Sequence, residues 1–229
     1  MNIINIVGKI ADDLKVKAYI VGGPVRDKLL DIEDLDLDFV VEADGIKFAE
    51  ALNKTLKGKL TVYKAFGTAT ITTVLHLRSA RRSQRIDIVT ARKERYKHPA
   101  AYPDVTPGTI KDDLFRRDFT INAMAIAVNK KGLGRLVDFY NGRKDLKKRL
   151  IRVLHDKSFM DDPTRIFRAV RFSVRFGFRI EPHTKKLMKE AVSDGLLGEV
   201  NAGRIRKEVE LFLKEKNPKK CLDVFSKLM

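Results

Sequence analysis

Two aspartates separated by a single residue, Asp36 and Asp38, are the first side chains in this sequence that could do chemistry. They lie in the stretch LDLDFVV, where acidic and apolar residues alternate. Alternation of this kind predicts a β-strand with both carboxylates on one face, about 6.5–7 Å apart. Carboxylates at that spacing can share a divalent cation, and hard oxygen ligands suit Mg²⁺. Surface strands also carry acids without a metal, so the spacing alone leaves both interpretations open.

The segment GGPVRD, at residues 22–27, precedes this strand. AYIV before it predicts a short buried strand, and PVRDKLL predicts a helix with Pro24 in its first turn. Gly22 and Gly23 between a strand and a helix would let backbone amides approach phosphate oxygens. Most glycine pairs only make a turn, and the dinucleotide pattern GxGxxG is absent here. The glycines together with the later carboxylates favour a nucleoside triphosphate bound with Mg²⁺.

Asp87 is a third candidate for the metal site. It lies between two isoleucines in RIDIVTA, a predicted strand in which a lone acid is costly unless it is paired. If this strand neighbours Asp36 and Asp38, Asp87 is a possible third metal ligand. An ion pair with Arg85 explains it equally well.

Four arginines in DDPTRIFRAVRFSVRFGF recur at helical spacing, namely Arg165, Arg168, Arg171 and Arg175. A solvated charged face is the usual explanation of such a stripe. However, no acid interleaves, and arginine is suited to bidentate contacts with phosphates and base edges. Asp162 precedes Arg165 by one helical turn, so a carboxylate acceptor and a guanidinium donor could face one base.

Composition restricts the class of protein. The 229 residues carry 47 Lys and Arg against 30 Asp and Glu, a net charge of +17, which predicts a polyanionic partner. No apolar run is long enough to span a bilayer, so no membrane partner is expected. The lone Cys221 indicates a reducing, cytoplasmic location. The four histidines are scattered without the spacing of a zinc site.

The elements that position these residues are a mixed α/β part followed by a helical, more basic remainder. Strands are predicted at LTVYKAF, TATITTVLHL and RIDIVTA, and a helix at DGIKFAEALNKTLKG with Asp44 as N-cap and Gly58 at its end. Three prolines and a glycine predict a long, partly ordered loop over residues 94–113. No strand is expected after about residue 161.

Taken in order, GGPVRD, DLD, RRDFTINAMA, LVDFYNGRKDL and DDPTRIFRAVRF resemble the class II tRNA nucleotidyltransferases and their bacterial poly(A) polymerase relatives. The resemblance runs from about residue 18 to 192. It implies an α+β fold: a polymerase-β-like nucleotidyltransferase head with a small mixed sheet flanked by helices (1–145), then an all-helical neck with a nucleobase-recognition motif (146–229). The family's body and tail domains are absent or truncated, so a further domain or subunit is expected to grip the tRNA.

The resemblance also implies residue roles. The catalytic, metal-binding pair falls on Asp36 and Asp38. Asp162 and Arg165 match a pair that acts as a protein template for the incoming base, and Arg168 and Arg171 continue a phosphate-binding stripe. The full set of expected nucleotide-binding residues is Gly22, Gly23, Arg26, Arg117, Asp162, Arg165, Arg168 and Arg171.

The implied function is Mg²⁺-dependent, nucleic-acid-template-independent addition of nucleotides to the tRNA 3′ end, with two Mg²⁺ ions and release of pyrophosphate. Residues 95–109 lie where the family keeps a flexible loop, and its full length argues against an enzyme that adds only CC. The expected product is therefore the terminal A made from ATP, or the full CCA made from ATP and CTP. A poly(A) polymerase, or a non-catalytic RNA-binding module of the same fold, remains an alternative.

Overall fold

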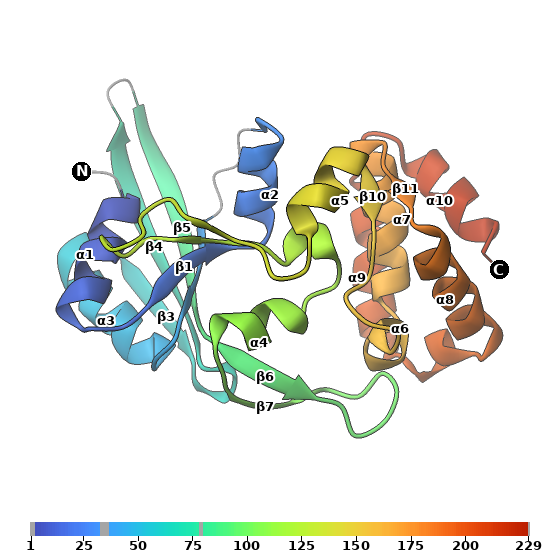
Figure 1. Cartoon of the computed structure of the whole chain (residues 1–229), viewed down its shortest axis with the longest axis horizontal. Helices are drawn as coiled ribbons and strands as arrows, with labels where there is room; N and C mark the ends of the chain where they lie inside the picture. Colours follow the sequence, from blue (N-terminus) through green and yellow to red (C-terminus); the bar gives the residue numbers. More distant parts are fainter. Residues whose placement is uncertain (1–2, 33–36, 78–79, 229) are drawn as a thin grey trace. The chain divides into compact units, whose positions relative to one another are not determined.

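The computed structural model describes residues 3–32, 37–77 and 80–228, which form two compact units (Figure 1). The first unit, here called the head, consists of residues 1–93, 105–116 and 122–140. The second, here called the neck, consists of residues 94–104, 117–121 and 141–229. The neck therefore includes two short segments that precede its main stretch in the sequence.

The head is built on a mixed sheet of seven strands in the order β3-β4-β5-β2-β1-β8-β9 (Figure 1). The strands β2 and β5 are parallel, and the other neighbouring pairs are antiparallel. The predicted mixed sheet is thus confirmed. The strands are β1 (Ala18–Val21), β2 (Leu37–Val41), β3 (Lys59–Tyr63), β4 (Thr68–Leu77), β5 (Ala80–Thr90), β8 (Ala125–Ala127) and β9 (Leu136–Val137).

Local signals set the ends of the head helices. Asp44 caps the third helix as predicted, because its carboxylate accepts hydrogen bonds from the backbone N–H groups of Ile46 and Lys47. That helix ends through Lys57 in the left-handed conformation, and a Cβ on the following Gly58 would lie 2.7 Å from a backbone oxygen of β4. The head helices are α1 (Ile3–Asp13), α2 (Gly23–Leu29), α3 (Gly45–Leu56), η1 (Lys64–Phe66) and α4 (Ile110–Phe115), and η2 spans Thr120–Asn122.

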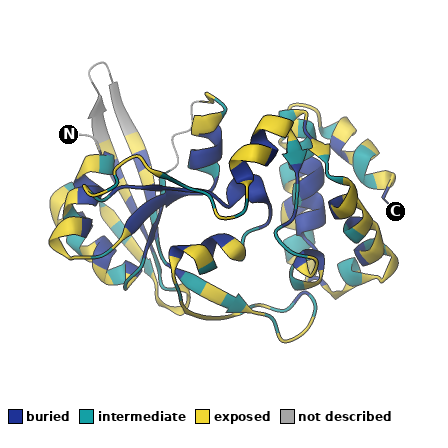
Figure 2. Ribbon diagram, viewed as in Figure 1, coloured by how far each residue is buried: buried dark blue, intermediate teal, exposed yellow. Residues whose placement is uncertain are grey.

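The head core lies between the sheet and its helices (Figure 2). Phe39, Ile86 and Ile88 from the central strands β2 and β5 are completely buried. Phe48 and Leu52 of α3 are buried against the sheet. Burial of such side chains contributes roughly 1.5–3 kcal/mol each and fixes the strands that carry the candidate carboxylates.

The neck is helical, with α5 (Gly142–Lys148), α6 (Ser158–Asp161), α7 (Arg165–Phe176), α8 (Pro182–Ser193), η3 (Leu196–Glu199), α9 (Ala202–Leu213) and α10 (Pro218–Ser226). Phe167 of α7 stacks on Phe225 of α10 at 4.7 Å between ring centroids, and Phe212 of α9 lies 5.7 Å from Phe167. The expectation of no strand after residue 161 is wrong by one short element. The two-residue strand β11 (Arg179–Ile180) pairs in parallel with β10 (Leu150–Ile151).

The segment predicted as a long loop contains regular structure. Strands β6 (Arg92–Arg95) and β7 (Asp104–Pro107) form a separate two-stranded sheet, and α4 begins at Ile110. A capping box between Thr109 and Asp112 starts that helix. Of residues 94–113, only 96–103 and 108–109 lie outside these elements and fit the predicted loop. Pro107 lies at the end of β7, where an edge strand tolerates it. In the described parts of the chain, none of the helices has the length and apolar character needed to cross a bilayer.

Candidate active site

The candidate metal site lies on the central strands of the head. Asp36 is outside the described residues. Asp38 in β2 is the register partner of Asp87 in the parallel strand β5, and both side chains are half-buried. Residues in register on neighbouring strands, about 4.8 Å apart, project from the same face. The fold therefore brings together two acids that are 49 positions apart in the sequence (87 minus 38).

Asp87 also has partners on its own face of the sheet. It accepts a hydrogen bond from Thr70 Oγ1 at 2.5 Å, and Arg85 Nε lies 2.9 Å from its Oδ2. The expected ion pair of Asp87 with Arg85 is present, and Asp87 also neighbours Asp38. A role of Asp87 as a metal ligand stays a prediction. The Arg85 side chain is mostly exposed, so this ion pair is weak. No group of three metal-binding side chains is found within the described ranges, which leave out Asp36.

The turn between β1 and α2 depends on Gly22. Its φ of 74° and ψ of −129° are rarely adopted by residues with a side chain. Gly22 N–H donates to the Met124 carbonyl, and its own carbonyl accepts from Arg26 N–H. Helix α2 begins at Gly23, with Pro24 in its first turn as predicted. A Cβ on Gly23 would make an ordinary van der Waals contact with Arg26 Nη2 at 3.6 Å and would clash with no other part of the described chain.

Arg26 holds the turn in place. It is only 6% exposed, and its Nε and Nη2 donate to the two carboxylate oxygens of Asp27 at 2.8 and 2.7 Å. Its Nη1 donates to Asn122 Oδ1 at 2.6 Å. The guanidinium therefore connects α2 to the RRDFTINAMA segment, a contact that sequence reasoning missed. Its predicted role in nucleotide binding stays a prediction.

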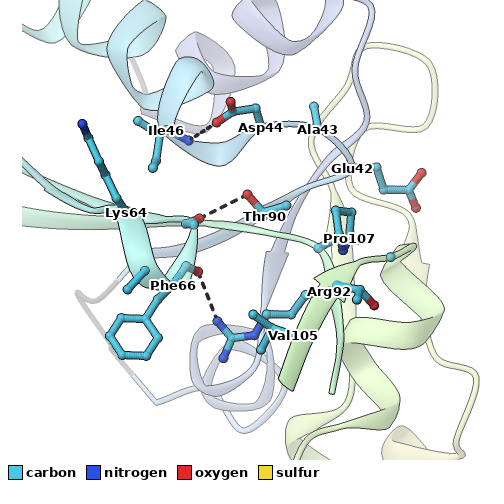
Figure 3. Close-up of a pocket in the computed structure, with 15 residues that line it drawn as sticks. Glu42, Ala43, Asp44, Ile46, Lys64, Phe66, Thr90, Arg92, Val105 and Pro107 are labelled. Atoms are coloured by element: carbon cyan, nitrogen blue, oxygen red, sulfur yellow. Dashed lines mark hydrogen bonds between the residues drawn. The ribbon is translucent and has the colours of Figure 1, made fainter. Parts of the chain in front are cut away.

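A cavity of about 600 Å³ opens on the head (Figure 3). It lies beyond the ends of β2 and β5 and is lined by Phe66, Thr90, Arg92, Val105 and Pro107, among others. Thr90 Oγ1 and Arg92 Nη1 donate to backbone carbonyls of the chain that follows β3. Among the residues that the structure describes, none of the site residues predicted from the sequence lines this cavity.

In the neck, Asp162 lies between two helices. It follows α6, and its carbonyl accepts the backbone N–H of Arg165, the first residue of α7. Asp162 and Arg165 are therefore adjacent, although the backbone of Asp162 is extended and not helical. Oδ1 of Asp162 accepts from Thr164 N–H at 3.0 Å and from Thr164 Oγ1 at 2.6 Å. It also accepts from Arg204 Nη2 of α9 at 2.7 Å, a partner that sequence reasoning missed.

Arg165 is buried, with 5% exposure, and its Nη1 donates to Ser158 Oγ at 2.8 Å. Ser158 begins α6, so this bond joins the helix before Asp162 to the helix after it. Burial raises the pKa of the neighbouring Asp161 carboxyl, although Arg165 opposes that rise. The segment between α6 and α7 is thus held by a contact between the two flanking helices. The template role of Asp162 and Arg165 stays a prediction.

The remaining stripe arginines meet acids from other parts of the neck. Arg168 Nε and Nη2 donate to Asp118 Oδ2 at 2.8 and 2.6 Å, and this carboxylate raises the pKa of Arg168. Arg171 is buried, 3.7 Å from Glu215 and 4.0 Å from Glu208. The sequence shows no acid within the stripe, but the fold supplies these acids. The phosphate-binding role of Arg168 and Arg171 stays a prediction.

Arg117 belongs to a short segment of the neck and is half-buried. Its neighbour Arg116, in the head, donates from Nε and Nη2 to Asp113 Oδ1 at 3.0 and 2.7 Å. The next residue, Asp118, accepts from Phe119 N–H and from Arg168. The RRD sequence thus forms ion pairs with residues on either side of it, and the nucleotide contact expected of Arg117 stays a prediction.

Two family profiles match this chain. The profile described as "Poly A polymerase head domain" matches residues 18–152, and "Probable RNA and SrmB- binding site of polymerase A" matches residues 177–228. The A-adding tRNA nucleotidyltransferase of Aquifex aeolicus is 45% identical over 93% of this chain and 25% of its own length. Three curated relatives named A-adding are 41–45% identical to this chain, and five named CC-adding or multifunctional CCA proteins are 36–37% identical.

Solved structures agree in fold. A CCA-adding enzyme in apo form II aligns with a TM-score of 0.91 and 47% identity over 99% of this chain and 52% of that one. The Thermotoga maritima CCA-adding enzyme complexed with tRNA aligns with a TM-score of 0.84 and 45% identity over 99% of this chain and 50% of that one. The chain spans between a quarter and a half of the length of the curated relatives it matches. It belongs to the class II tRNA nucleotidyltransferase and poly(A) polymerase family, and it carries the head and neck of that family.

Proposed function

We propose that this chain supplies the catalytic head and base-reading neck of a tRNA nucleotidyltransferase. It would add the 3′-terminal A from ATP, or the full CCA from ATP and CTP, to the tRNA 3′ end. The register pairing of Asp38 with Asp87 carries the proposal, because it places two carboxylates on one face of the strands that the head profile matches. Relatives described as complexes with tRNA, ATP and CTP support the choice of substrates.

The carboxylates suit a divalent metal. Head domains of this polymerase-β-like type generally use one, and we propose two Mg²⁺ ions held by Asp36 and Asp38, with Asp87 as a third ligand. Bound Mg²⁺ would lower the pKa of an RNA 3′-hydroxyl and neutralise charge on the triphosphate. Gly22 and Gly23 would bind that triphosphate through their backbone, with room for it beside Gly23, and Arg26 would hold the turn that they form.

Base choice would come from Asp162 and Arg165 in the neck. Adenine and cytosine both present an exocyclic amino group, which can donate a hydrogen bond to a carboxylate, whereas guanine and uracil present a carbonyl at the equivalent position. A carboxylate acceptor next to a guanidinium donor therefore favours ATP and CTP. The phosphates of the nucleotide or RNA would meet Arg117, Arg168 and Arg171.

The higher identity to relatives named A-adding favours terminal A addition, whereas the solved relatives include CCA-adding enzymes. We therefore propose A or CCA as the product. A poly(A) polymerase is the second candidate, because the matching head profile bears that description. A further domain or subunit would grip the rest of the tRNA. A cytoplasmic location stays a prediction.

The test is incorporation onto tRNA transcripts that end before CCA, after C and after CC, with Mg²⁺ and with ATP, CTP or both. A added only to the CC end would identify an A-adding enzyme, and ordered CCA on the shortest transcript would identify a CCA-adding enzyme. Long A tails on unrelated RNA would identify a poly(A) polymerase. A short acceptor minihelix serves as a second substrate, because it needs less of the protein for binding.

Variants separate catalysis from RNA binding. Asp38→Asn and Asp87→Asn should reduce incorporation strongly and leave RNA binding intact, whereas Glu50→Gln should match the wild type. Glu50 is an exposed acid on α3, which makes it a suitable control. Near wild-type incorporation by Asp38→Asn would refute the proposed metal site. RNA binding without any incorporation by the wild-type chain would indicate the non-catalytic module.

A further inference from the structure

Arg204 of α9 connects the candidate base-reading carboxylate to the segment 94–104 within the neck. Its Nη2 donates to Asp162 Oδ1 at 2.7 Å, and its Nη1 donates to the Ala100 carbonyl at 3.0 Å. The guanidinium carbon also lies 5.5 Å from the centre of the Tyr102 ring. We propose that Arg204 is a positioning residue for base recognition: it orients the Asp162 carboxylate and couples that orientation to residues 100–102. This inference rests on the proposed role of Asp162.

Within the described residues, the hydrogen bonds to the Asp162 carboxylate are made to one of its two oxygens. The backbone and hydroxyl of Thr164 and the guanidinium of Arg204 all donate to Oδ1. Across the ranges that the structure describes, none of the recorded hydrogen bonds of Asp162 is made to Oδ2. Three donors on one oxygen hold the carboxylate plane and leave the second oxygen to accept a hydrogen bond from an amino group.

The partial exposure of Asp162 and Arg204 fits a site that a nucleotide can reach. The Asp162 and Arg204 side chains are each 24% exposed, so they are partly screened from water without being sealed. A charged donor at 2.7 Å in such surroundings gives a stronger contact than a fully exposed ion pair. Arg204 therefore restricts Asp162 more than a mobile surface lysine would.

The other contacts of Arg204 fall on a segment with an unusual backbone. Ala100 has a φ of 59°, a left-handed conformation that is disfavoured for alanine. Its N–H donates to the Met160 carbonyl of α6, while its carbonyl accepts from Arg204. Tyr102 is 75% exposed and covers the guanidinium. A shift of this segment would remove one partner of Arg204 and so change how firmly Asp162 is held.

The test compares ATP with purine ribonucleoside triphosphate, which lacks only the 6-amino group. Calorimetry with Mg²⁺ measures both affinities for the wild-type chain and for Arg204→Met, Arg204→Lys and Arg206→Met. Arg206 is an exposed arginine on the same helix and serves as the matched control. We expect the wild type to prefer ATP by roughly 10- to 100-fold, since that is the worth of one hydrogen bond to a charged group.

Arg204→Met should lower this preference by about fivefold or more and leave the affinity for the analogue within about twofold, because the analogue does not use Asp162 Oδ2. Arg206→Met should keep the wild-type preference. The preference of Arg204→Lys for ATP over the analogue should lie between those of the wild type and Arg204→Met, because a compact ammonium lacks the planar fork that reaches both partners. An equal loss of both affinities would overturn the inference, because it would indicate a general structural role.

The proposed function and the inference fail in different ways. A wild type that binds both nucleotides equally would remove the base-reading role of Asp162 and the inference with it. A wild type that discriminates, with unchanged discrimination in the Arg204 variants, would overturn the inference alone. If Arg204→Met does not fold, Arg204→Lys decides in the same way, and an unchanged preference in that variant refutes the positioning role.

Discussion

Replacing either partner of the Arg168–Asp118 ion pair alone should destabilise the neck. Two guanidinium nitrogens of Arg168 donate to one oxygen of Asp118, whose side chain is only 7% exposed. Removing one partner of a buried ion pair costs about 3–5 kcal/mol. The Arg168 side chain is one third exposed, so water replaces part of the lost interaction. We therefore expect Arg168→Met to lower the free energy of unfolding by about 2–3 kcal/mol.

The assay is a double-mutant cycle. Arg168→Met, Asp118→Asn and the double variant are unfolded in urea, and the loss of neck helix is followed by circular dichroism. With a urea dependence of roughly 2 kcal/mol per molar, a loss of 2–3 kcal/mol lowers the midpoint by about 1 M. The double variant should be more stable than the sum of the single losses predicts, by about 1.5–3 kcal/mol, since neither charge is left unpaired.

A coupling energy below about 0.5 kcal/mol would refute this reasoning, because that is the value of an exposed surface pair. The same variants also test the phosphate-binding role proposed for Arg168. If Arg168→Met kept wild-type stability and weakened the binding of Mg²⁺-ATP, Arg168 would serve the nucleotide and its pairing with Asp118 would be incidental.

Three further predictions test packing and charge. Gly8→Ala should cost about 1–3 kcal/mol, because its Cβ would lie 2.1 Å from the Val128 carbonyl oxygen, whereas Gly198→Ala meets open space and should be neutral in thermal unfolding. Phe212→Ala should cost about 3–5 kcal/mol in urea unfolding, and a loss below 1 kcal/mol would contradict the packing of the neck core. Burial lowers the pKa of His155, so the unfolded chain takes up its proton first and stability should fall as the pH drops below about 6.5. His155→Gln should flatten that slope, and an unchanged slope would assign it to another group.

Much of the fold is predictable because its signals are local. Asp44 caps its helix through backbone groups two and three residues away, and Pro24 starts its helix through its own fixed φ. The alternation around Asp38 predicts a strand because side chains on a strand change face at every residue. The loop prediction over residues 94–113 failed in part, because prolines do not exclude short edge strands.

The partners of the site residues could not be predicted in the same way. Asp38 meets Asp87 only because β2 and β5 pair in parallel and in one particular register. Arg168 pairs with Asp118, which is 50 positions away in the sequence, and Asp162 pairs with Arg204, which is 42 positions away. Sequence spacing reports which face of an element a side chain occupies, but not which distant element packs against that face.

The sequence by itself therefore determined the family, the carboxylate strand and the arginine stripe, since each is written in residue types and short spacings. Only the tertiary structure decided that Asp87 joins Asp38, that acids from other segments pair with the stripe, and that Arg204 holds Asp162. The physical reason is that these charges are stabilised by long-range pairing in a partly buried environment. Such pairing exists only after the strands and helices have packed.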